Sequence, residues 1–164
     1  MRFLPLLRPG GTALDLAAGS GRHSQLLLSH GLAVTAVDRD PDRQPDVPGL
    51  TKIAADLESG APWPLGGRQF DVVVVTNYLH RPILGDIVGA VAPGGLLLYE
   101  TFALGNERFG KPSNPDFLLR PDELKAAVAG RLDVIAFEEV ELGAPRPAIV
   151  QRIAARAQGG GRRS

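Results

Sequence analysis

The chain has 164 residues and a formal net charge of zero, with 18 Lys+Arg against 18 Asp+Glu. Hydrophobic residues at 44% and charged residues at 22% are typical of globular proteins and exclude wholesale disorder. The absence of cysteine excludes thiolate metal sites, disulfides and thiol nucleophiles. This length predicts one domain over residues 1–157, followed by a disordered tail, Gln158–Ser164 (QGGGRRS).

The same features bear on location and partners. No stretch approaches the roughly 20 apolar residues that span a bilayer, and the run at Met1–Pro9 is too short for a signal peptide. Lack of cysteine is compatible with a reducing compartment, so we expect a cytoplasmic protein without a membrane partner. Balanced charge disfavours a nucleic-acid partner, and the sequence leaves the oligomeric state open.

Short apolar runs alternate with helix-like stretches, and no internal repeat is visible. Five runs are predicted as buried strands: Thr12–Leu16, Ala33–Val37, Ile53–Ala55, Phe70–Val75 and Leu96–Tyr99. Helices are predicted over Arg22–His30, over Ile83–Val91 and from Pro121 onward. This alternation predicts an α/β fold with a doubly wound, mostly parallel sheet.

Three further segments complete the predicted organisation. Residues 39–50 contain three prolines and are expected to be a loop with at most one turn. Residues 104–120 form a long polar loop, and loops of this length in compact domains are usually functional. Leu132–Glu141 and Ala148–Ala154 are predicted as a closing hairpin joined by Gly143-Ala144-Pro145, with Pro93-Gly94-Gly95 forming an earlier tight turn.

Polar side chains end or closely follow each of the five predicted strands. They are Asp15, Asp38, Asp56, Asn77 and Glu100. In an open α/β sheet the ligand lies outside the carboxyl ends of the strands, so these side chains are expected at one site.

A turn of small residues follows the first strand and precedes the first helix. It comprises Ala17, Ala18, Gly19, Ser20 and Gly21. Small residues allow a ligand to approach the backbone, and the helix start offers free N–H groups. Ser24 stands where the dinucleotide fingerprint G-x-G-x-x-G has its third glycine, so the turn matches that pattern only in part.

The acids narrow the choice of ligand. Asp38 can accept both ribose hydroxyls of either NAD or S-adenosylmethionine, so it does not separate them. Asp56, after the third strand, suits the amino group of adenine. Asp15, just before the glycine turn, is unfavourable beside a pyrophosphate and favourable beside the cationic amino-acid end of S-adenosylmethionine.

The stretches Leu14–His23, Val37-Asp38, Ala55–Leu57, Phe70–Val74 and Ala92–Gly95 together resemble a class I S-adenosylmethionine-dependent methyltransferase. Within that class the chain is most similar to small tellurite-resistance-type or general methyltransferase domains. The resemblance covers about residues 10 to 155. It implies a Rossmann-like, seven-stranded sheet with an antiparallel last strand and helices on both faces.

The resemblance also implies which residues bind the cofactor, S-adenosyl-L-methionine. Asp15 and the turn Ala17–Gly21 would hold the methionine part, Asp38 the ribose, and Asp56 with Leu57 the adenine. Arg39, Asn77 and Tyr78 are placed beside them, with Tyr78 as a cation–π partner of the sulfonium.

Two features depart from the class. Ala17 stands where the class often has glycine, although alanine is small enough that we expect binding to survive. About ten residues precede the first strand and leave little of the usual leading helix. The substrate lid is therefore expected to be incomplete or to come from elsewhere.

Methyl transfer from a sulfonium is an in-line displacement that needs positioning more than acid–base chemistry. Asn77, His80 and Glu100 are the candidate catalytic residues, and no metal is expected. In the alternative interpretation Tyr78 and Leu79 pack beneath the cofactor, while His80 and Arg81 cap the next helix. Glu100 is then the partner of another side chain, Arg108 or Arg120.

The long polar loop is the candidate for acceptor recognition. Its candidate residues are Asn106, Glu107, Arg108, Phe109, Asn114 and Phe117. The alternative is a structured connector in which Asn114-Pro115 makes a turn and Phe117 fills the core. Tyr78 occupies the place of the first proline in an Asn-Pro-Pro-aromatic motif, which counts against DNA adenine methylation.

These observations predict S-adenosylmethionine-dependent methyl transfer to a small-molecule acceptor. Tellurite, a small carboxylic acid, a quinone precursor and a modified nucleoside all stay open as acceptors. The alternatives are a non-catalytic S-adenosylmethionine-binding module, or a partner subunit of another methyltransferase. An NAD-dependent oxidoreductase is disfavoured by Asp15 and by the missing third glycine.

Overall fold

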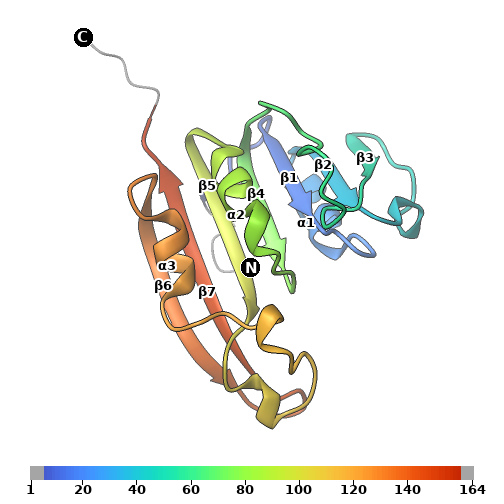
Figure 1. Cartoon of the computed structure of the whole chain (residues 1–164). Helices are drawn as coiled ribbons and strands as arrows, with labels where there is room; N and C mark the ends of the chain where they lie inside the picture. The colour runs from blue at the N-terminus through green and yellow to red at the C-terminus, as the bar shows by residue number, and fades with distance from the viewer. Residues whose placement is uncertain (1–5, 160–164) are drawn as a thin grey trace.

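One seven-stranded sheet forms the centre of the computed structural model, which describes residues 6–159 (Figure 1). The rest of the chain, 1–5 at the start and 160–164 in the predicted tail, lies outside the described residues. The strands are β1 (Thr12–Leu16), β2 (Ala33–Asp38), β3 (Leu50–Ala54), β4 (Phe70–Thr76), β5 (Val91–Phe102), β6 (Leu132–Leu142) and β7 (Ala148–Ala157). Their order across the sheet is β3-β2-β1-β4-β5-β7-β6.

The direction of the strands confirms the predicted mixed sheet. β3, β2, β1, β4 and β5 pair in parallel, whereas β7 pairs antiparallel with β5 on one side and with β6 on the other. β4 lies at the middle of the order, and its run Val72–Val75 is buried. A run of β-branched residues with both faces covered is what a central parallel strand requires.

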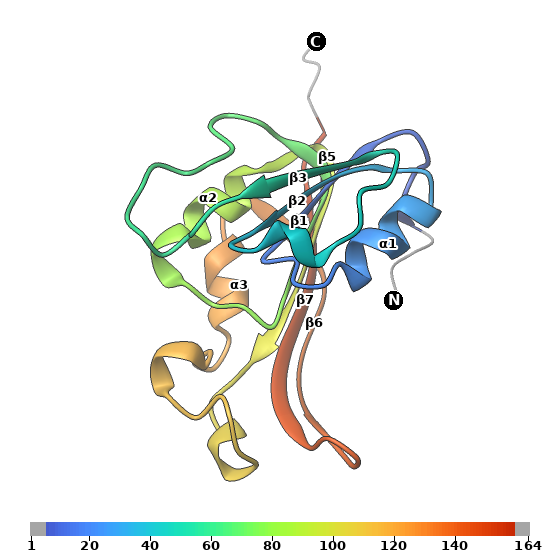
Figure 2. The same ribbon diagram turned by 90° about the vertical axis from the view of Figure 1, so that its right-hand side faces the viewer.

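Helices cover both faces of the sheet, as predicted (Figure 2). α1 (Arg22–Ser29) packs on one face, and α2 (Leu84–Gly89) and α3 (Glu123–Val128) pack on the other. Short 3-10 helices occupy four connections: η2 (Pro41–Arg43), η3 (Arg81–Ile83), η4 (Asn106–Arg108) and η5 (Pro115–Phe117). Two buried hydrophobic clusters lie on the two faces, around Leu27 and Val34 beneath α1 and around Ile87 and Leu124 beneath α2 and α3.

Several element boundaries differ from the sequence prediction, and strand pairing explains them. β3 begins at Leu50 rather than Ile53 because it pairs with β2 from Val34 onward. The predicted helix Ile83–Val91 ends at Gly89, since Val91 pairs with Phe70 and opens β5. The predicted turn at Pro93–Gly95 therefore lies inside β5, where the register with β4 shifts.

The hairpin is longer than predicted. β7 continues past Ala154 to Ala157, which lies opposite Leu132, and the Gln158 carbonyl accepts a hydrogen bond from the Gly94 N–H at 3.0 Å. The first residue of the predicted tail is thus hydrogen-bonded to β5, although the strand itself ends at Ala157.

Helix coverage is thin on the face of α1. β2 and β3 are joined by η2 alone, and no other helix of residues 6–159 lies on this face. A groove of about 870 Å³ runs beside α1 over β4, β5 and β7, with Val74, Leu98 and Ala154 on its floor. No helix among the described residues is long and apolar enough to cross a membrane.

Candidate functional site

The sheet register brings the predicted strand-end residues to one edge. Asp15 on β1 lies opposite Ala36 of β2 and Val74 of β4, close to the carboxyl ends of all three strands. Asp38 ends β2 and Asn77 directly follows β4. Parallel strands share their carboxyl edge, so side chains from three neighbouring strands meet there.

The glycine turn wraps closely over this edge. Two of its N–H groups donate within the fold. The Ala18 N–H donates to the Val37 carbonyl of β2 (3.1 Å), and the Gly21 N–H donates to the Ala18 carbonyl in the turn itself (3.0 Å). Gly19 and Gly21 have φ of 59° and 91°, and α1 starts at the next residue, Arg22. Ala17 has φ 54°, a left-handed conformation that favours glycine. This explains the class preference for glycine at that position.

Asp38 joins the glycine turn to β2. Its Oδ2 accepts from the Gly19 N–H at 2.5 Å, and its Oδ1 accepts from the Asp40 N–H at 3.1 Å. A carboxylate has about four acceptor positions. Asp38 is only partly buried, so it retains acceptor capacity for two ligand hydroxyls.

Asp15 is the buried acid of the site, with 3% of its surface exposed. Its Oδ2 accepts a hydrogen bond from the Ser24 hydroxyl at 2.7 Å. Burial raises the pKa of Asp15 to about 6, partly offset by the hydrogen bonds from Ser24. Ser24, fully buried where a dinucleotide turn has glycine, therefore anchors this carboxyl group. A nearby cation would favour its ionised form.

The residues after β3 approach the loop after β4. The Tyr78 hydroxyl donates to Glu58 Oε2 at 3.2 Å, and Asp56 Oδ1 accepts from the Glu58 N–H at 3.0 Å. Burial, followed by the Glu58 carboxylate, holds the pKa of Tyr78 far above its ordinary value, with smaller effects from Asp56 and Arg39. Asp56 and Arg39 thus lie near enough to Tyr78 for their charges to affect its pKa. Leu57 is half-buried and packs against the core.

Asn77 turns the chain away from β4. It has φ 56°, its side chain is exposed, and its N–H donates to the Glu100 carbonyl at 2.9 Å. The backbone of the next residue, Tyr78, is held in place because its carbonyl accepts a hydrogen bond from the Tyr99 hydroxyl at 2.7 Å. Leu79 is 5% exposed and belongs to the core, which agrees with the packing interpretation for that residue.

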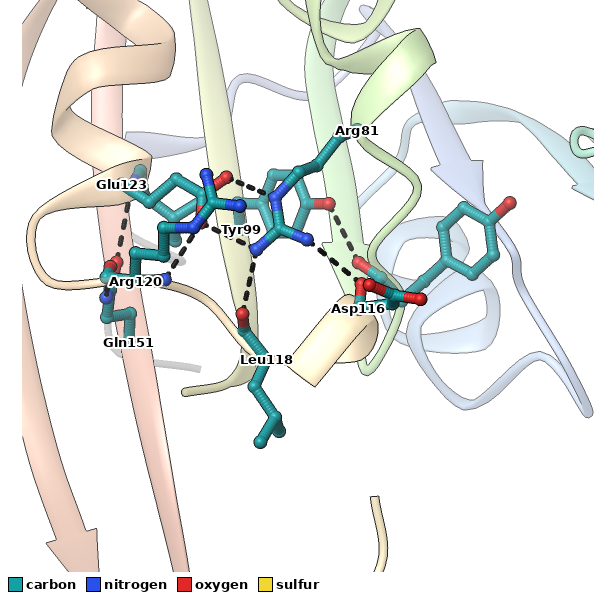
Figure 3. A network of polar contacts seen from close by, with 9 residues as sticks. Arg81, Tyr99, Asp116, Leu118, Arg120, Glu123 and Gln151 are labelled. Carbon is teal, nitrogen blue, oxygen red and sulfur yellow. Dashed lines mark hydrogen bonds and ion pairs between the residues drawn. The ribbon is translucent and has the colours of Figure 1, made fainter. Parts of the chain in front are cut away.

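The Arg81 side chain joins α3 to the end of the segment 104–120 and does not cap a helix (Figure 3). It forms a two-pronged ion pair with Glu123, at 2.7 and 2.9 Å, and donates to the carbonyls of Asp116 (3.1 Å) and Leu118 (2.8 Å). His80 occupies the N-cap position of η3, but its side chain makes no capping hydrogen bond. The interpretation that His80 and Arg81 cap the next helix is therefore wrong for their side chains.

Glu100 has a different partner from either predicted one. It lies directly opposite Arg152 in the β5–β7 register, and Arg152 Nε contacts its Oε1 at 2.7 Å. Arg152 also contacts Glu138 at 3.1 Å. The predicted pairing of Glu100 with Arg108 or Arg120 is wrong, because cross-strand register brings Arg152 to it instead. Its carboxylate lines the groove beside α1.

The segment 104–120 is held to the sheet by Asn106, which is 2% exposed. Its amide donates to the Pro112 carbonyl (2.9 Å) and accepts from the Ile149 N–H (3.0 Å). Glu107 accepts from the Gly105 N–H at 2.9 Å, and Arg108 stacks over the ring of Phe109 and pairs with Glu141 at 3.5 Å. Asn106, Glu107 and Arg108 therefore make contacts within the fold.

Phe117 lies at the surface of this segment rather than in the core. Asn114 Oδ1 accepts from the Asp116 N–H at 2.9 Å and starts η5, as expected of an Asn-Pro turn. Phe117 is 47% exposed, so the alternative in which it fills the core is wrong. Its ring lines a pocket of about 280 Å³ together with Asn77 and Tyr78.

The sequence did not reveal two residues that support the site. Gln44 is 3% exposed and packs against Gly21, and neither atom of its amide has a hydrogen-bond partner. Glu58 meets Tyr78 across the edge of the sheet. Both lie in connections without periodicity, where contacts depend on the tertiary fold. Among residues 6–159, no group of three or more His, Asp and Glu side chains is arranged to hold a metal ion.

The fold is similar to those of solved methyltransferase structures. TehB from Haemophilus influenzae matches with a TM-score of 0.70 and 19% identity, over 96% of this chain and 60% of that chain. A Burkholderia thailandensis 1,6-didemethyltoxoflavin-N1-methyltransferase, solved with 1,6-didemethyltoxoflavin and S-adenosylhomocysteine, matches with a TM-score of 0.66 and 18% identity, over 95% and 74%. An S-adenosylmethionine-dependent methyltransferase from Mesorhizobium loti matches with a TM-score of 0.69 and 17% identity, over 94% and 95%.

Sequence comparison adds no relative to these. No protein family model and no curated protein sequence matches the chain. The chain spans 60% of the TehB chain, so the activity of that whole protein does not follow from the match. The order and direction of the strands agree with the architecture of these solved structures. The chain therefore has the class I S-adenosylmethionine-dependent methyltransferase fold.

Proposed function

We propose that this protein binds S-adenosyl-L-methionine and transfers its methyl group to a small-molecule acceptor. The observation that carries the proposal is the contact between Asp38 and Gly19, with Asp15 beneath the same turn. A ribose acceptor, a close backbone approach and a buried acid thus meet at one edge of a sheet with the methyltransferase fold. A structural neighbour with this fold holds S-adenosylhomocysteine, the product of such a transfer.

The residues present fit the cofactor. Gly19 leaves the space that a Cβ would occupy, so a ligand can approach the backbone between β1 and α1, whereas the space beside Gly21 is filled by Gln44. We assign the methionine part to Asp15 and the turn Ala17–Gly21, the ribose to Asp38, and the adenine to Asp56 and Leu57. Tyr78 stays protonated because of its raised pKa, and so would meet a sulfonium with a neutral ring.

The cofactor supplies an activated methyl group on a positively charged sulfur. The contribution of the chain is to hold donor and acceptor in line and to exclude water. Asn77 is placed to position the acceptor because its side chain is exposed at the carboxyl edge. The carboxylate of Glu100 is engaged in an ion pair with Arg152, so we rank it below His80 as a candidate general base.

Two other functions are weaker accounts of the same site. An NAD-dependent oxidoreductase would place a pyrophosphate against Asp15, and burying two like charges together is unfavourable. A non-catalytic S-adenosylmethionine-binding module would share the cofactor residues and lack an acceptor position. Nucleic acid is not proposed as a partner, and a cytoplasmic location stays a prediction from the sequence.

The proposal is tested with methyl-labelled S-adenosylmethionine and a fractionated cell extract. We expect one small-molecule fraction to take up label with the wild-type protein. Asn77→Ala should bind cofactor normally and lose most of the turnover. Tight cofactor binding with no labelled product in any fraction would favour the non-catalytic module.

A further inference from the structure

A small pocket at the carboxyl edge of the sheet lies beside the proposed cofactor site. Its volume is about 280 Å³, and it is formed where the loops after β3 and β4 and the end of β5 meet the segment 104–120. Tyr78, which we place beside the sulfonium, and Asn77, which we assign to the acceptor, both line it. A molecule seated there would therefore lie next to the transferred methyl group, and the inference rests on the proposed function in this respect.

The lining of the pocket is mainly apolar and aromatic. Its apolar side chains are Tyr78, Leu79, Phe102, Pro112 and Phe117. An apolar cavity of roughly 150 Å³ is enough to hold benzene. A pocket of about 280 Å³ therefore has room for one or two fused rings. Phe117 is 47% exposed, and a ring laid against it would cover this apolar surface.

The charge of the lining restricts the occupant further. The one ionisable acid on it is Glu58, and no lysine or arginine of the described residues lines it. Arg81 and Arg39 lie in this region and neither lines the pocket: Arg81 is taken up by Glu123 and by two backbone carbonyls, and Arg39 is exposed. An oxyanion or carboxylate would find no compensating cation among the lining side chains, which is costly in a partly desolvated pocket.

Glu58 and the aromatic rings instead favour the opposite charge. The Glu58 carboxylate accepts one hydrogen bond, from the Tyr78 hydroxyl at 3.2 Å, and keeps acceptor capacity for another donor. The faces of Tyr78, Phe102 and Phe117 carry the negative part of the ring quadrupole. We infer that the acceptor is a small, flat, ring-bearing molecule that is uncharged or basic, and that it is methylated on nitrogen.

The transfer balances with the proposed cofactor alone. The lone pair of a ring or amine nitrogen forms the new N–C bond while the C–S bond breaks. The electron pair of that bond returns to sulfur, giving S-adenosylhomocysteine. A proton, where the nitrogen carries one, passes to water. No oxidant or further co-reactant is needed.

The groove beside α1 provides the contrasting site. Arg22 and Arg152 line it together with Glu100 and Glu138, both of which contact Arg152. An anionic acceptor such as tellurite or a carboxylic acid could meet Arg22 there, whereas no lysine or arginine of the described residues lines the pocket of Phe117. The experiment can distinguish the sites because they share no aromatic side chain of segment 104–120.

The test compares 3-aminoquinoline, quinoline-3-carboxylate and tellurite as probes of the full chain. Binding is measured by calorimetric titration with and without S-adenosylhomocysteine, and transfer is measured with labelled S-adenosylmethionine. We expect the amine to bind at least tenfold more tightly than the carboxylate and to be the labelled product. Phe117→Ser should weaken amine binding at least tenfold while cofactor affinity stays unchanged.

Phe109→Ser is the matched control, because Phe109 is exposed on the same segment and does not line the pocket. It should leave amine binding unchanged, and Glu58→Gln should reduce the preference for amine over carboxylate. Tighter binding of the carboxylate or tellurite, or equal effects of the two phenylalanine variants, would overturn the inference. Failure of the protein to bind S-adenosylmethionine would instead overturn the proposed function.

Discussion

Asp15 is a carboxyl group held in a place that does not favour its charge. Its folded pKa is about 6 against 3.8 when exposed, so the folded state binds its proton more tightly. The stabilisation from this group is complete below the unfolded pKa and is lost as the pH rises through the folded one. At neutral pH the ionised carboxylate therefore costs stability, which a cationic ligand would offset.

Replacing this acid should separate stability from binding. We predict that Asp15→Asn raises the free energy of unfolding near neutral pH by on the order of 1–3 kcal/mol. It should also weaken S-adenosylmethionine binding, because the ammonium end loses its counter-charge. Urea unfolding with and without ligand measures both effects. A destabilised variant that binds like the wild type would refute this account of Asp15.

The same carboxyl group predicts how cofactor binding depends on pH. Binding to the ionised form alone would weaken about tenfold as the pH falls from about 7 to about 5. Titration calorimetry across this range measures it, and Asp15→Asn provides the flat reference. Equal pH dependence in both proteins would assign the effect to another group.

Gly21 is the residue of the turn with the least freedom to change. It has φ 91°, and a Cβ there would collide with the amide of Gln44. Gly21→Ala should therefore cost more than about 2 kcal/mol of stability, whereas Gly60→Ala, at φ 83° with open space around it, should cost about 1 kcal/mol. Thermal unfolding compares them, and equal costs would show that Gln44 moves aside freely.

At the scale of elements, the segment 104–120 is fixed to the sheet at both ends. Asn106 joins it to β7, and Arg81 joins it to α3 through Glu123 (Figure 3). The hydrogen bond from Arg81 holds the pKa of Glu123 below its ordinary value. These hydrogen bonds hold the backbone of the segment in place at one side of the pocket, and the exposed Phe117 projects from it.

This anchoring predicts a difference between two arginine variants. Arg81→Met removes a partly buried two-pronged ion pair and two carbonyl contacts, and should cost about 2–4 kcal/mol. Arg108→Met removes a pair with Glu141 in which both side chains are more than half exposed, together with contacts to Phe109 and the Gly105 carbonyl at the surface, and should cost less than about 1 kcal/mol. Urea unfolding of both variants checks this. Similar costs would mean that Arg81 does not hold the segment.

Sequence patterns predicted the elements better than the contacts between them. Buried runs such as Phe70–Val75 and the closing hairpin are local patterns, and all seven strands were found from them. Glu100 and Arg152 are 52 residues apart in sequence, and they pair because of the register between β5 and β7. A local sequence pattern carries no information on that register. Gln44 lies in a proline-rich connection, where burial follows only from the position of the glycine turn.

At the scale of the molecule, one edge of the sheet collects the features of a binding site. Acids from β1 and β2, the glycine turn and the loop after β4 all meet there, and the aromatic pocket lies beside them. The groove beside α1 is a second opening, lined by two arginines and two glutamates. The proposed cofactor site and the proposed acceptor pocket therefore lie side by side at one edge of the sheet.

Calorimetric titration of the purified chain with S-adenosylmethionine tests the central claim most directly. The account predicts saturable one-to-one binding, which Asp38→Ala weakens by at least about a hundredfold because two charge-assisted hydrogen bonds to the ribose are lost. Circular dichroism of the variant shows whether it keeps the fold. Absence of binding by the folded wild-type chain, or unchanged binding by a folded Asp38→Ala variant, would contradict the account.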